Sequence, residues 1–169
     1  TRELAKQICD VCKAWCKPMN FTVVNLLGGS GNLDQIQALR NTCEIVVGTP
    51  GRIIHFIKRK YLKVAGVKFL CLDEADKMLD LGFEGQIRTV CSQLRPDRLT
   101  LMFSATFKQN VQTLAGELLL SPVRINVGTI GAVNKDISQI PIVVARADDK
   151  KDWLRIKLPQ LIKEGSVLI

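Results

Sequence analysis

Short apolar stretches alternate along this chain with segments whose apolar residues recur every three or four positions, and this alternation constrains the fold more than any other feature. Strands are expected over residues 21–27, 44–48, 67–72, 100–104 and 123–127. Helices are expected over residues 2–16, from 32, over 51–60, and around 87–94 and 111–119. Strands that alternate with helices are typical of an α/β domain, and wholly apolar strands favour a parallel sheet covered on both faces.

Several predicted helices begin at recognisable signals. Asn32 is followed three residues later by Gln35, which resembles a capping box with asparagine as the cap. Thr49 and Pro50 provide a cap followed by proline at the first helical position, so the helix over 51–60 is expected to begin there.

The C-terminal part of the chain follows a different pattern. Clear periodicity is lost from Gly128 to about Lys151, which predicts a linker with one extended piece over 140–145. A last helix is expected to begin near Asp152, and Pro159 is expected to kink or divide it. The last residues resemble the opening of a strand, which predicts the start of a second domain.

The net charge of +8 lies mostly in the first half of the chain. Residues 1–72 carry 11 Lys/Arg against 4 Asp/Glu, whereas residues 73–169 carry 13 against 12. A basic half beside a balanced half suggests a face that binds a polyanion, and a solvated basic surface is the alternative that charge alone leaves open. No apolar run approaches the roughly 18 residues that a membrane span needs, so no membrane partner is expected.

The six cysteines are expected to be free thiols, because a core of this size needs no disulfides. Cys71, in a predicted strand, and Cys91, on an apolar helix face, should pack as small hydrophobes. Cys9, Cys12 and Cys16 fall on one face of the predicted first helix. Zinc sites usually show paired short spacings and a fourth ligand, so metal binding at this cluster is disfavoured.

Polar or glycine-containing clusters follow four of the predicted strands. Ligands of a parallel α/β sheet collect beyond the carboxyl ends of its strands. All the clusters are therefore expected at one functional edge of a single sheet. They are Gly28-Gly29, residues 49–52, residues 73–76 and residues 104–106.

The cluster that follows strand 67–72 carries the sharpest chemical signal, because an apolar strand there delivers Asp73 and then Glu74. In a nucleotide hydrolase, a first carboxylate at such a point holds Mg²⁺, largely through its water shell, and a second orients a water for in-line attack on the γ-phosphate. A pair of solvated acids at a strand end is the alternative. The presence of Asp76 and of the later cluster 104–106 argues against that alternative.

Together these clusters resemble the motifs of the DEAD-box RNA helicases of superfamily two. The matching segments occur in the family's order: TRELA (1–5), GG (28–29), TPGR (49–52), DEAD (73–76), GF (82–83) and SAT (104–106). The resemblance implies an α/β fold with a three-layer RecA-like parallel sheet, of the P-loop NTPase type, that is incomplete at both ends. It implies that residues 1–128 form the first RecA-like domain without its N-terminal nucleotide-loop portion, that 129–151 form an interdomain linker, and that 152–169 start a second RecA-like domain.

The resemblance also implies an ATP-dependent RNA helicase, with ATP and Mg²⁺ as cofactors and an intracellular location, in the nucleus or the cytoplasm, of which the nucleus is favoured. Asp73 and Glu74 would be catalytic and would hold Mg²⁺ largely through water. Asp76, Ser104 and Thr106 would couple ATP use to unwinding through hydrogen bonds. RNA would be bound through its backbone, with little sequence preference, by Thr1, Arg2, Gly29, Thr49, Gly51 and Arg52.

The sequence contains no G-x-x-x-x-G-K-[ST] phosphate loop, and none of its 12 glycines precedes a lysine. In the family this loop would precede Thr1, so helicase activity is expected of the intact parent protein and this chain alone is expected to be inactive. A non-catalytic RNA-binding or scaffold module derived from a helicase is the main alternative. A DNA translocase of the same superfamily is another, which the TPGR and SAT motifs disfavour.

Overall fold

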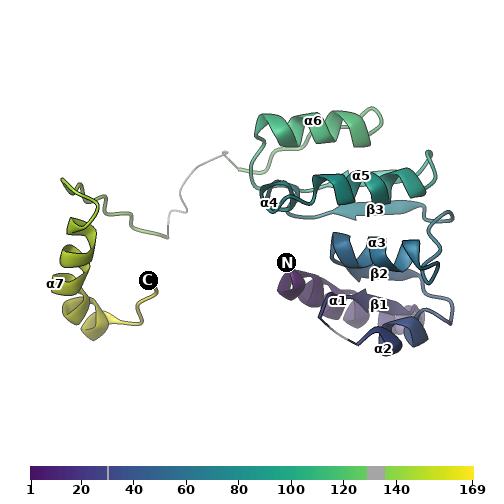
Figure 1. The fold of residues 1–169 in the computed structure, drawn as a ribbon, viewed down its shortest axis with the longest axis horizontal. Coiled ribbons are helices and arrows are strands. Elements are labelled where there is room, and N and C mark those ends of the chain that lie inside the picture. Colours follow the sequence, from purple (N-terminus) through teal and green to yellow (C-terminus); the bar gives the residue numbers. More distant parts are fainter. Residues whose placement is uncertain (30, 129–135) are drawn as a thin grey trace. The chain divides into compact units, whose positions relative to one another are not determined.

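Parallel strands alternate with helices along the larger part of the chain (Figure 1). The computed structural model describes residues 1–29, 31–128 and 136–169. The chain divides into two units, Thr1–Gly131 and Ala132–Ile169. No helix within the described ranges is long and apolar enough to cross a membrane. The order and direction of the strands confirm the predicted α/β class for the first unit.

The strands of the first unit form two parallel pairs. β1 (Val23–Leu26) pairs with β2 (Ile45–Gly48), and β3 (Phe69–Leu72) pairs with β4 (Leu99–Met102). Within the described residues no ladder joins the two pairs, so the single sheet expected from the sequence is found as two small sheets. Each ladder nevertheless brings the carboxyl ends of its two strands together, because the last residues of the paired strands are in register.

Helices connect the strands and pack on them. They are α1 (Arg2–Cys16), the short 3-10 helix η1 (Lys17–Met19), α2 (Asn32–Ala38), α3 (Pro50–Lys58), α4 (Ala75–Asp80), α5 (Glu84–Gln93) and α6 (Gln109–Leu118). α1 packs on both β1 and β2, and α3 contacts α5 (Figure 1). Packing between α3 and α5, rather than strand pairing, therefore links the β1–β2 pair to the β3–β4 pair.

Buried apolar side chains join each strand pair to its helices. Leu72 of β3 packs with Ile87 of α5 and Leu114 of α6, and both helix residues are almost fully buried. Leu26 of β1 and Phe56 of α3 are fully buried in a second cluster. Each such side chain contributes about 1.5–3 kcal/mol when it is removed from water. The two clusters thus hold the carboxyl ends of β1 and β3 firmly in place.

One face of the β3–β4 sheet is exposed. The side chains of Phe69 and Leu99 are 70% and 53% exposed, and Cys71 and Leu101 are exposed as well. The prediction that strand 67–72 is covered on both faces, with Cys71 as a packing residue, is therefore wrong. Side chains alternate between the two faces of a strand, and only the opposite face meets the buried cluster on α5 and α6 among the described residues.

The start of α2 differs from the sequence-based expectation, and that of α3 agrees only in part. α2 is capped by Gly31 without a side-chain hydrogen bond, so Asn32 is its first residue rather than its cap. The predicted capping box does not form, because Gln35 makes its hydrogen bonds elsewhere. Thr49 does cap α3 with Pro50 at the first helical position, but its hydroxyl makes no capping hydrogen bond.

The segment 123–127, predicted as a fifth strand, has no strand structure. Its Val123, Ile125 and Val127 side chains are 86%, 81% and 97% exposed. A strand needs a neighbouring backbone to pair its N–H and C=O groups, and no strand in the described part of the chain pairs with this segment. The apolar alternation of these residues is therefore not sufficient to form a strand.

The second unit contains the helix α7 (Asp149–Glu164). It begins at Asp149 rather than near Asp152. Pro159 was expected to kink or divide the helix; it lies inside one helix and does not divide it, and the kink stays a prediction. Proline removes one helical hydrogen bond. α7 has no buried residue, so water can satisfy the carbonyl that loses its partner.

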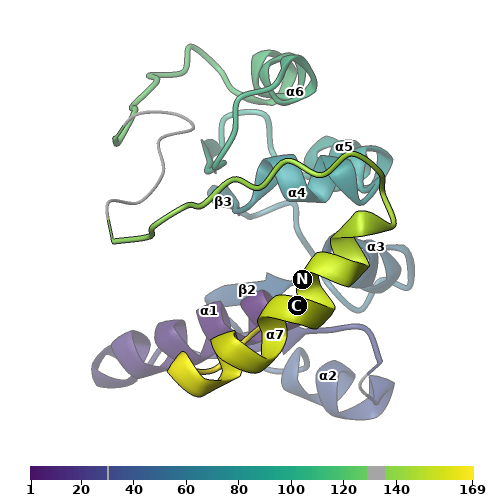
Figure 2. The ribbon, with the colours of Figure 1, turned by 90° about the vertical axis from the view of Figure 1, so that its left-hand side faces the viewer.

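An extended segment precedes α7, in the part of the chain predicted as a linker (Figure 2). Ile140 and Ile142 of this segment line a small hollow together with Trp153 of α7. Of the predicted linker 129–151, residues 129–135 lie outside the described residues.

Candidate functional site

The carboxyl end of β3 is tied to the end of β4 by backbone hydrogen bonds. The N–H of Phe103 donates to the Leu72 carbonyl at 2.8 Å, and the N–H of Ala75 donates to the Phe103 carbonyl at 3.0 Å. Ala75 is fully buried, whereas Asp73 is exposed. The backbone on both sides of Asp73 and Glu74 is therefore anchored, and these two acidic residues stand at the edge of the sheet.

Glu74 turns the chain from β3 into α4 through a left-handed backbone conformation, with φ 52° and ψ 48°. This conformation costs a residue with a Cβ about 1–2 kcal/mol, and such strain clusters at functional sites. The N–H of Glu74 donates to Asp73 Oδ1 at 2.9 Å, and Lys77 Nζ lies 3.3 Å from Glu74 Oε2. The turn and these two contacts together set the directions of both carboxylates.

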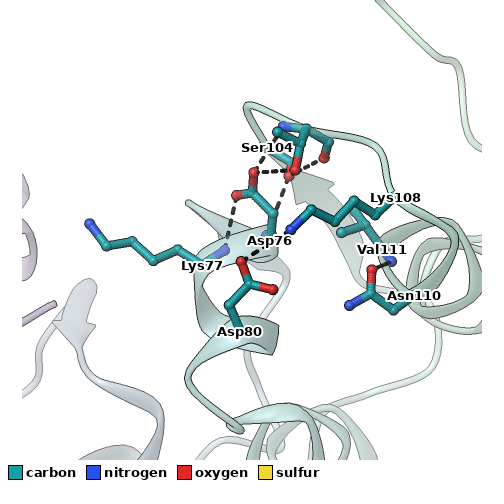
Figure 3. A network of polar contacts seen from close by, with 8 residues as sticks. Asp76, Lys77, Asp80, Ser104, Lys108, Asn110 and Val111 are labelled. Carbon is teal, nitrogen blue, oxygen red and sulfur yellow. Dashed lines mark hydrogen bonds and ion pairs between the residues drawn. The ribbon is translucent and has the colours of Figure 1, made fainter. Parts of the chain in front are cut away.

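Asp76 connects this turn to the residues that follow β4 (Figure 3). Its Oδ2 accepts two hydrogen bonds from Thr106, one from the backbone N–H at 2.8 Å and one from the hydroxyl at 2.7 Å. The N–H of Asp76 donates to Ser104 Oγ at 3.3 Å, and that hydroxyl donates to the Thr106 carbonyl at 2.7 Å. The three residues predicted to act together are thus joined by direct hydrogen bonds.

The Asp76 carboxylate is held in its ionised form. Burial raises its pKa, but the hydrogen bonds from Thr106, Lys77 and Ser104 outweigh burial and lower the pKa below its ordinary value of 3.8. An ionised carboxylate can only accept hydrogen bonds, and Oδ1 accepts the remaining one from the Lys77 N–H at 3.0 Å. Asp76 is therefore committed to this network, which leaves Asp73 and Glu74 as the carboxylates available to a ligand.

The donor set at the end of β3 fits Mg²⁺. Mg²⁺ prefers carboxylate oxygens and keeps several waters and substrate phosphates among its ligands, so one or two carboxylates are enough. Asp73 is exposed, and Glu74 Oε2 accepts no hydrogen bond from the described residues and meets the Lys77 ammonium instead. No group of three or more His, Cys, Asp or Glu side chains that could hold a metal occurs in the described ranges.

A second cluster surrounds the turn that follows β1. Gly29 adopts φ 82°, a region that favours glycine, and a Cβ at this position would lie 2.9 Å from Arg2 Nη1. The guanidinium of Arg2 therefore lies directly against the backbone of the turn. Arg2 is exposed at the start of α1. The absence of a side chain at Gly29 allows this close approach.

The Arg52 side chain, in the first turn of α3, is held on two sides. Its Nε donates to Gln35 Oε1 at 3.0 Å, and its guanidinium carbon lies 4.7 Å from the centre of the Phe56 ring. Gln35 Nε2 donates in turn to the Leu27 carbonyl at 3.1 Å. Gln35 belongs to α2 and is 7% exposed, so a buried amide connects Arg52 to the strand end that precedes the glycine turn.

Sequence reasoning missed the role of Gln35, because it treated this residue as part of a capping box. A recognisable signal is its position four residues before Leu39, which packs against the buried cluster around Phe56. A polar residue on the core-facing side of a helix needs a hydrogen-bond partner inside the protein. Lys77, which pairs with Glu74, was also missed, although an acidic and a basic residue three positions apart is a recognised pairing pattern on helices.

Three other predicted residues lie at helix N-termini. Thr1 caps α1, since its Oγ1 accepts a hydrogen bond from the Leu4 N–H at 3.2 Å. Thr49 caps α3 through its backbone carbonyl, which accepts from the Ile53 N–H at 3.0 Å. Gly51 is exposed in the first turn of α3, and a Cβ there would meet nothing within 4 Å. Helix N-termini carry partial positive charge and favour anions.

The predicted site residues therefore form two groups. Asp73, Glu74, Asp76, Ser104 and Thr106 lie around the ends of β3 and β4, whereas the basic and glycine residues lie around the ends of β1 and β2. No ladder joins the two pairs among the described residues, so the shared edge of all clusters stays a prediction.

The three cysteines of α1 serve mainly to pack the helix. Cys9 and Cys16 are buried against Val23 of β1, and Cys12 is partly buried beside them. Burial raises the pKa of the Cys9 and Cys12 thiols. Protonated thiols in apolar surroundings act as small hydrophobic side chains.

Comparison with known proteins shows which family this chain resembles. The model of the DEAD/DEAH box helicase family matches residues 1–114. The chain is 48% identical over 169 residues to a protein of Oryza sativa subsp. japonica named DEAD-box ATP-dependent RNA helicase 24, and it covers 22% of that protein. It is 43% identical over the same length to ATP-dependent RNA helicase DDX42 of Homo sapiens, of which it covers 18%. The chain thus spans about a fifth of the length of these curated relatives.

Solved structures show the same likeness. A DEAD box protein from Methanococcus jannaschii matches with a TM-score of 0.68 and 37% identity, over 72% of this chain and 33% of that one. A hypothetical ATP-dependent RNA helicase from Sulfolobus tokodaii matches with a TM-score of 0.68 and 29% identity, over 72% of this chain and 36% of that one. These matches confirm the predicted RecA-like α/β fold class.

Proposed function

Because this chain belongs to the DEAD/DEAH box helicase family, we propose that the full-length protein is an ATP-dependent RNA helicase, which uses ATP hydrolysis to separate RNA strands. The observation that carries the proposal is the hydrogen-bonded bridge from Asp76 to Thr106 and Ser104. It joins the segment that bears the acidic pair to the neighbouring strand end. The names of the relatives, all ATP-dependent RNA helicases, support it.

Asp73 and Glu74 are the proposed catalytic carboxylates. Glu74 orients a water for in-line attack on the γ-phosphate, and Asp73 with Glu74 would hold Mg²⁺, largely through water. When bound, this ion offsets the negative charge of the phosphates. The anchored turn around Glu74 supports this role, because a carboxylate whose direction is already set needs little reorganisation during the reaction.

The RNA backbone is the proposed ligand of the second cluster. Arg2 and Arg52 supply positive charge, and Gly29, which has no side chain, permits the RNA backbone to approach the turn closely. The N-termini of α1 and α3, with Thr1, Thr49 and Gly51, favour a phosphate. All these contacts are directed to phosphate and sugar, so little sequence preference is expected.

Coupling between the two activities is assigned to Asp76, Ser104 and Thr106. Three hydrogen bonds of this network join the segment after β3 to the segment after β4, and a fourth joins Ser104 to Thr106 within the latter segment. A displacement of the acidic turn would therefore move the end of β4. The network supports a two-way link between the state of the nucleotide and the position of the strand ends.

The proposed domain organisation keeps residues 1–128 as part of the first RecA-like domain, 129–151 as a linker and 152–169 as the start of a second RecA-like domain. The chain contains no lysine-bearing phosphate loop, so ATP hydrolysis is proposed for the full-length protein and not for this chain alone. An intracellular location, in the nucleus or the cytoplasm with the nucleus favoured, stays a prediction.

The full-length protein tests the proposal. Purified protein is mixed with ATP, Mg²⁺ and a short RNA duplex carrying one labelled strand, and phosphate release and strand separation are followed together. We expect RNA to stimulate ATP hydrolysis and ATP to be required for strand separation. RNA binding without stimulated hydrolysis would favour the scaffold alternative. Equal activity on a DNA duplex would favour a DNA translocase.

A further inference from the structure

Gln35 is the one buried polar side chain in the described part of the chain, and both ends of its amide are used. Its Nε2 donates to the Leu27 carbonyl at 3.1 Å, and its Oε1 accepts from Arg52 Nε at 3.0 Å. A buried amide is retained at little cost only when its polar atoms are paired. The two hydrogen bonds fix the orientation of the Gln35 amide, and the bond from Arg52 Nε in turn restricts the orientation of the Arg52 guanidinium.

Gln35 connects three elements that carry the second cluster. Leu27 is followed at once by the glycine turn after β1, Gln35 lies on α2, and Arg52 lies in the first turn of α3. The Phe56 ring supports the guanidinium from a second side, at 4.7 Å. A long arginine side chain loses rotamer freedom when it binds a ligand. These two contacts restrict Arg52 before any ligand arrives, so less freedom remains to be lost.

The neutral charge of Gln35 matters as much as its position. Arg88 and Arg95 are paired with carboxylates, at Glu84 and Asp97, which offset their charge. An amide oxygen instead orients Arg52 through one N–H donor and carries no charge. Gln35 therefore orients Arg52 without adding a negative charge beside the guanidinium.

We propose that Gln35 is a positioning residue, which holds the Arg52 guanidinium in the direction needed to contact a phosphate of the RNA backbone. The inference rests on the proposed function, because that function supplies the RNA. It adds a residue from α2, outside the segments that resemble family motifs, to the proposed RNA site. Gln35 itself need not touch RNA.

The test is a double-mutant cycle in the full-length protein. Gln35→Met keeps the length of the side chain and removes both hydrogen bonds, and Arg52→Ala removes the guanidinium. The readout is the dissociation constant for a labelled single-stranded RNA. We expect Gln35→Met to weaken binding roughly 3- to 10-fold when Arg52 is present, and less than about twofold in the Arg52→Ala background. Gln37→Met, at an exposed glutamine of the same helix, is the matched control and should leave the affinity unchanged.

Gln35→Glu provides a second test that does not depend on the methionine variant folding well. It retains an acceptor for Arg52 Nε but adds a negative charge beside the guanidinium. We expect weaker RNA binding and a salt dependence of log K that is shallower by up to about one unit, because one phosphate contact loses its effective charge. If Gln35 did not contact Arg52 in the protein in solution, the added charge would leave the salt dependence unchanged.

The outcomes separate the inference from the proposed function. If Arg52→Ala does not weaken RNA binding, the proposed RNA role of Arg52 is wrong. A second outcome is that Arg52→Ala weakens RNA binding, but Gln35→Met has no effect or weakens it equally with and without Arg52. In that case Gln35 does not position Arg52, and the helicase proposal stands. An unchanged salt dependence in Gln35→Glu would overturn the inference as well.

Discussion

Thr106 donates two hydrogen bonds to a single carboxylate oxygen of Asp76, from its backbone N–H at 2.8 Å and from its hydroxyl at 2.7 Å. The two residues follow different strands, β3 and β4, and are 30 positions apart in the chain. Hydrogen bonds to a charged group are stronger than those between neutral groups. This pair is therefore the main polar link between the acidic turn and the end of the neighbouring strand.

Thr106→Val tests whether this link couples ATP use to unwinding. Valine keeps the shape of the side chain and removes the hydroxyl donor, while the backbone N–H bond can persist. In the full-length protein we expect the rate of strand separation to fall about tenfold, because a lost hydrogen bond of roughly 1.5 kcal/mol corresponds to such a factor. The rate of ATP hydrolysis should change much less. The measurement compares both rates in one preparation.

Thr113→Val is the control for that experiment, because the Thr113 hydroxyl bonds only within its own helix, to the Gln109 carbonyl. It should leave the ratio of the two rates unchanged. Equal losses of hydrolysis and strand separation in Thr106→Val would show that the residue serves ATP hydrolysis itself.

The ionised state of Asp76 predicts a pH dependence of stability. Because the pKa of folded Asp76 lies below the ordinary value of 3.8, its contacts stabilise the fold fully above that value, and this contribution is lost as the pH falls through the folded pKa. Asp76→Asn should lower the free energy of unfolding by about 1–3 kcal/mol at neutral pH. The difference from the unchanged protein should shrink as the pH falls below 3.8 and through the folded pKa, as urea unfolding at neutral and at acidic pH would reveal.

Asp80→Asn is the matched control for the pH experiment. Asp80 is exposed, and its Oδ2 lies 3.4 Å from Lys108 Nζ in an ion pair open to solvent (Figure 3). Its loss should change the free energy of unfolding by under about 1 kcal/mol at either pH. A constant difference between Asp76→Asn and the unchanged protein across the pH range would mean that Asp76 titrates alike in the folded and unfolded chain.

Glu74→Gln should nearly abolish ATP hydrolysis in the full-length protein while ATP binding persists. The amide keeps the size of the side chain but loses the charge that aligns the attacking water, and such a loss lowers the rate by roughly 100-fold or more. Single-turnover hydrolysis and nucleotide titration measure the two properties separately. Glu84→Gln, on α5, is the control, and it should hydrolyse ATP at a near-normal rate. If Glu74→Gln also hydrolysed ATP at a near-normal rate, Glu74 would not be the catalytic carboxylate.

Gly29→Ala should destabilise the protein and weaken RNA binding together. The φ of 82° is unfavourable for alanine by about 1 kcal/mol, and the new Cβ would lie 2.9 Å from Arg2 Nη1, so Arg2 must move. Gly85→Ala, in α5, meets nothing within 4 Å and should be neutral or slightly stabilising. Urea midpoints and RNA titrations check both effects, and an unchanged RNA affinity in Gly29→Ala would show that the position of Arg2 against the turn is unimportant.

Much of the site could be predicted from the sequence because its residues are placed by short-range rules. The apolar run before Asp73 predicts a strand, and the residues directly after a parallel strand must lie at its carboxyl edge. The same rule placed Ser104 and Thr106 after β4, next to the DEAD segment. Local patterns also predicted α1 and the proline at the start of α3 correctly, since helix periodicity and the fixed φ of proline act within a few residues.

What lay beyond prediction depends on partners distant in the chain. The apolar alternation of 123–127 is that of a strand, yet no neighbouring backbone in the described structure pairs with it. Likewise only one face of β3 is covered, because α5 and α6 pack on one side. The role of Gln35 was decided by the positions of Leu27 and Arg52, on two other elements. Periodicity along the chain determined which segments become strands and helices, whereas packing between segments decided which faces are buried and which polar groups meet, because those contacts join residues that no local pattern relates.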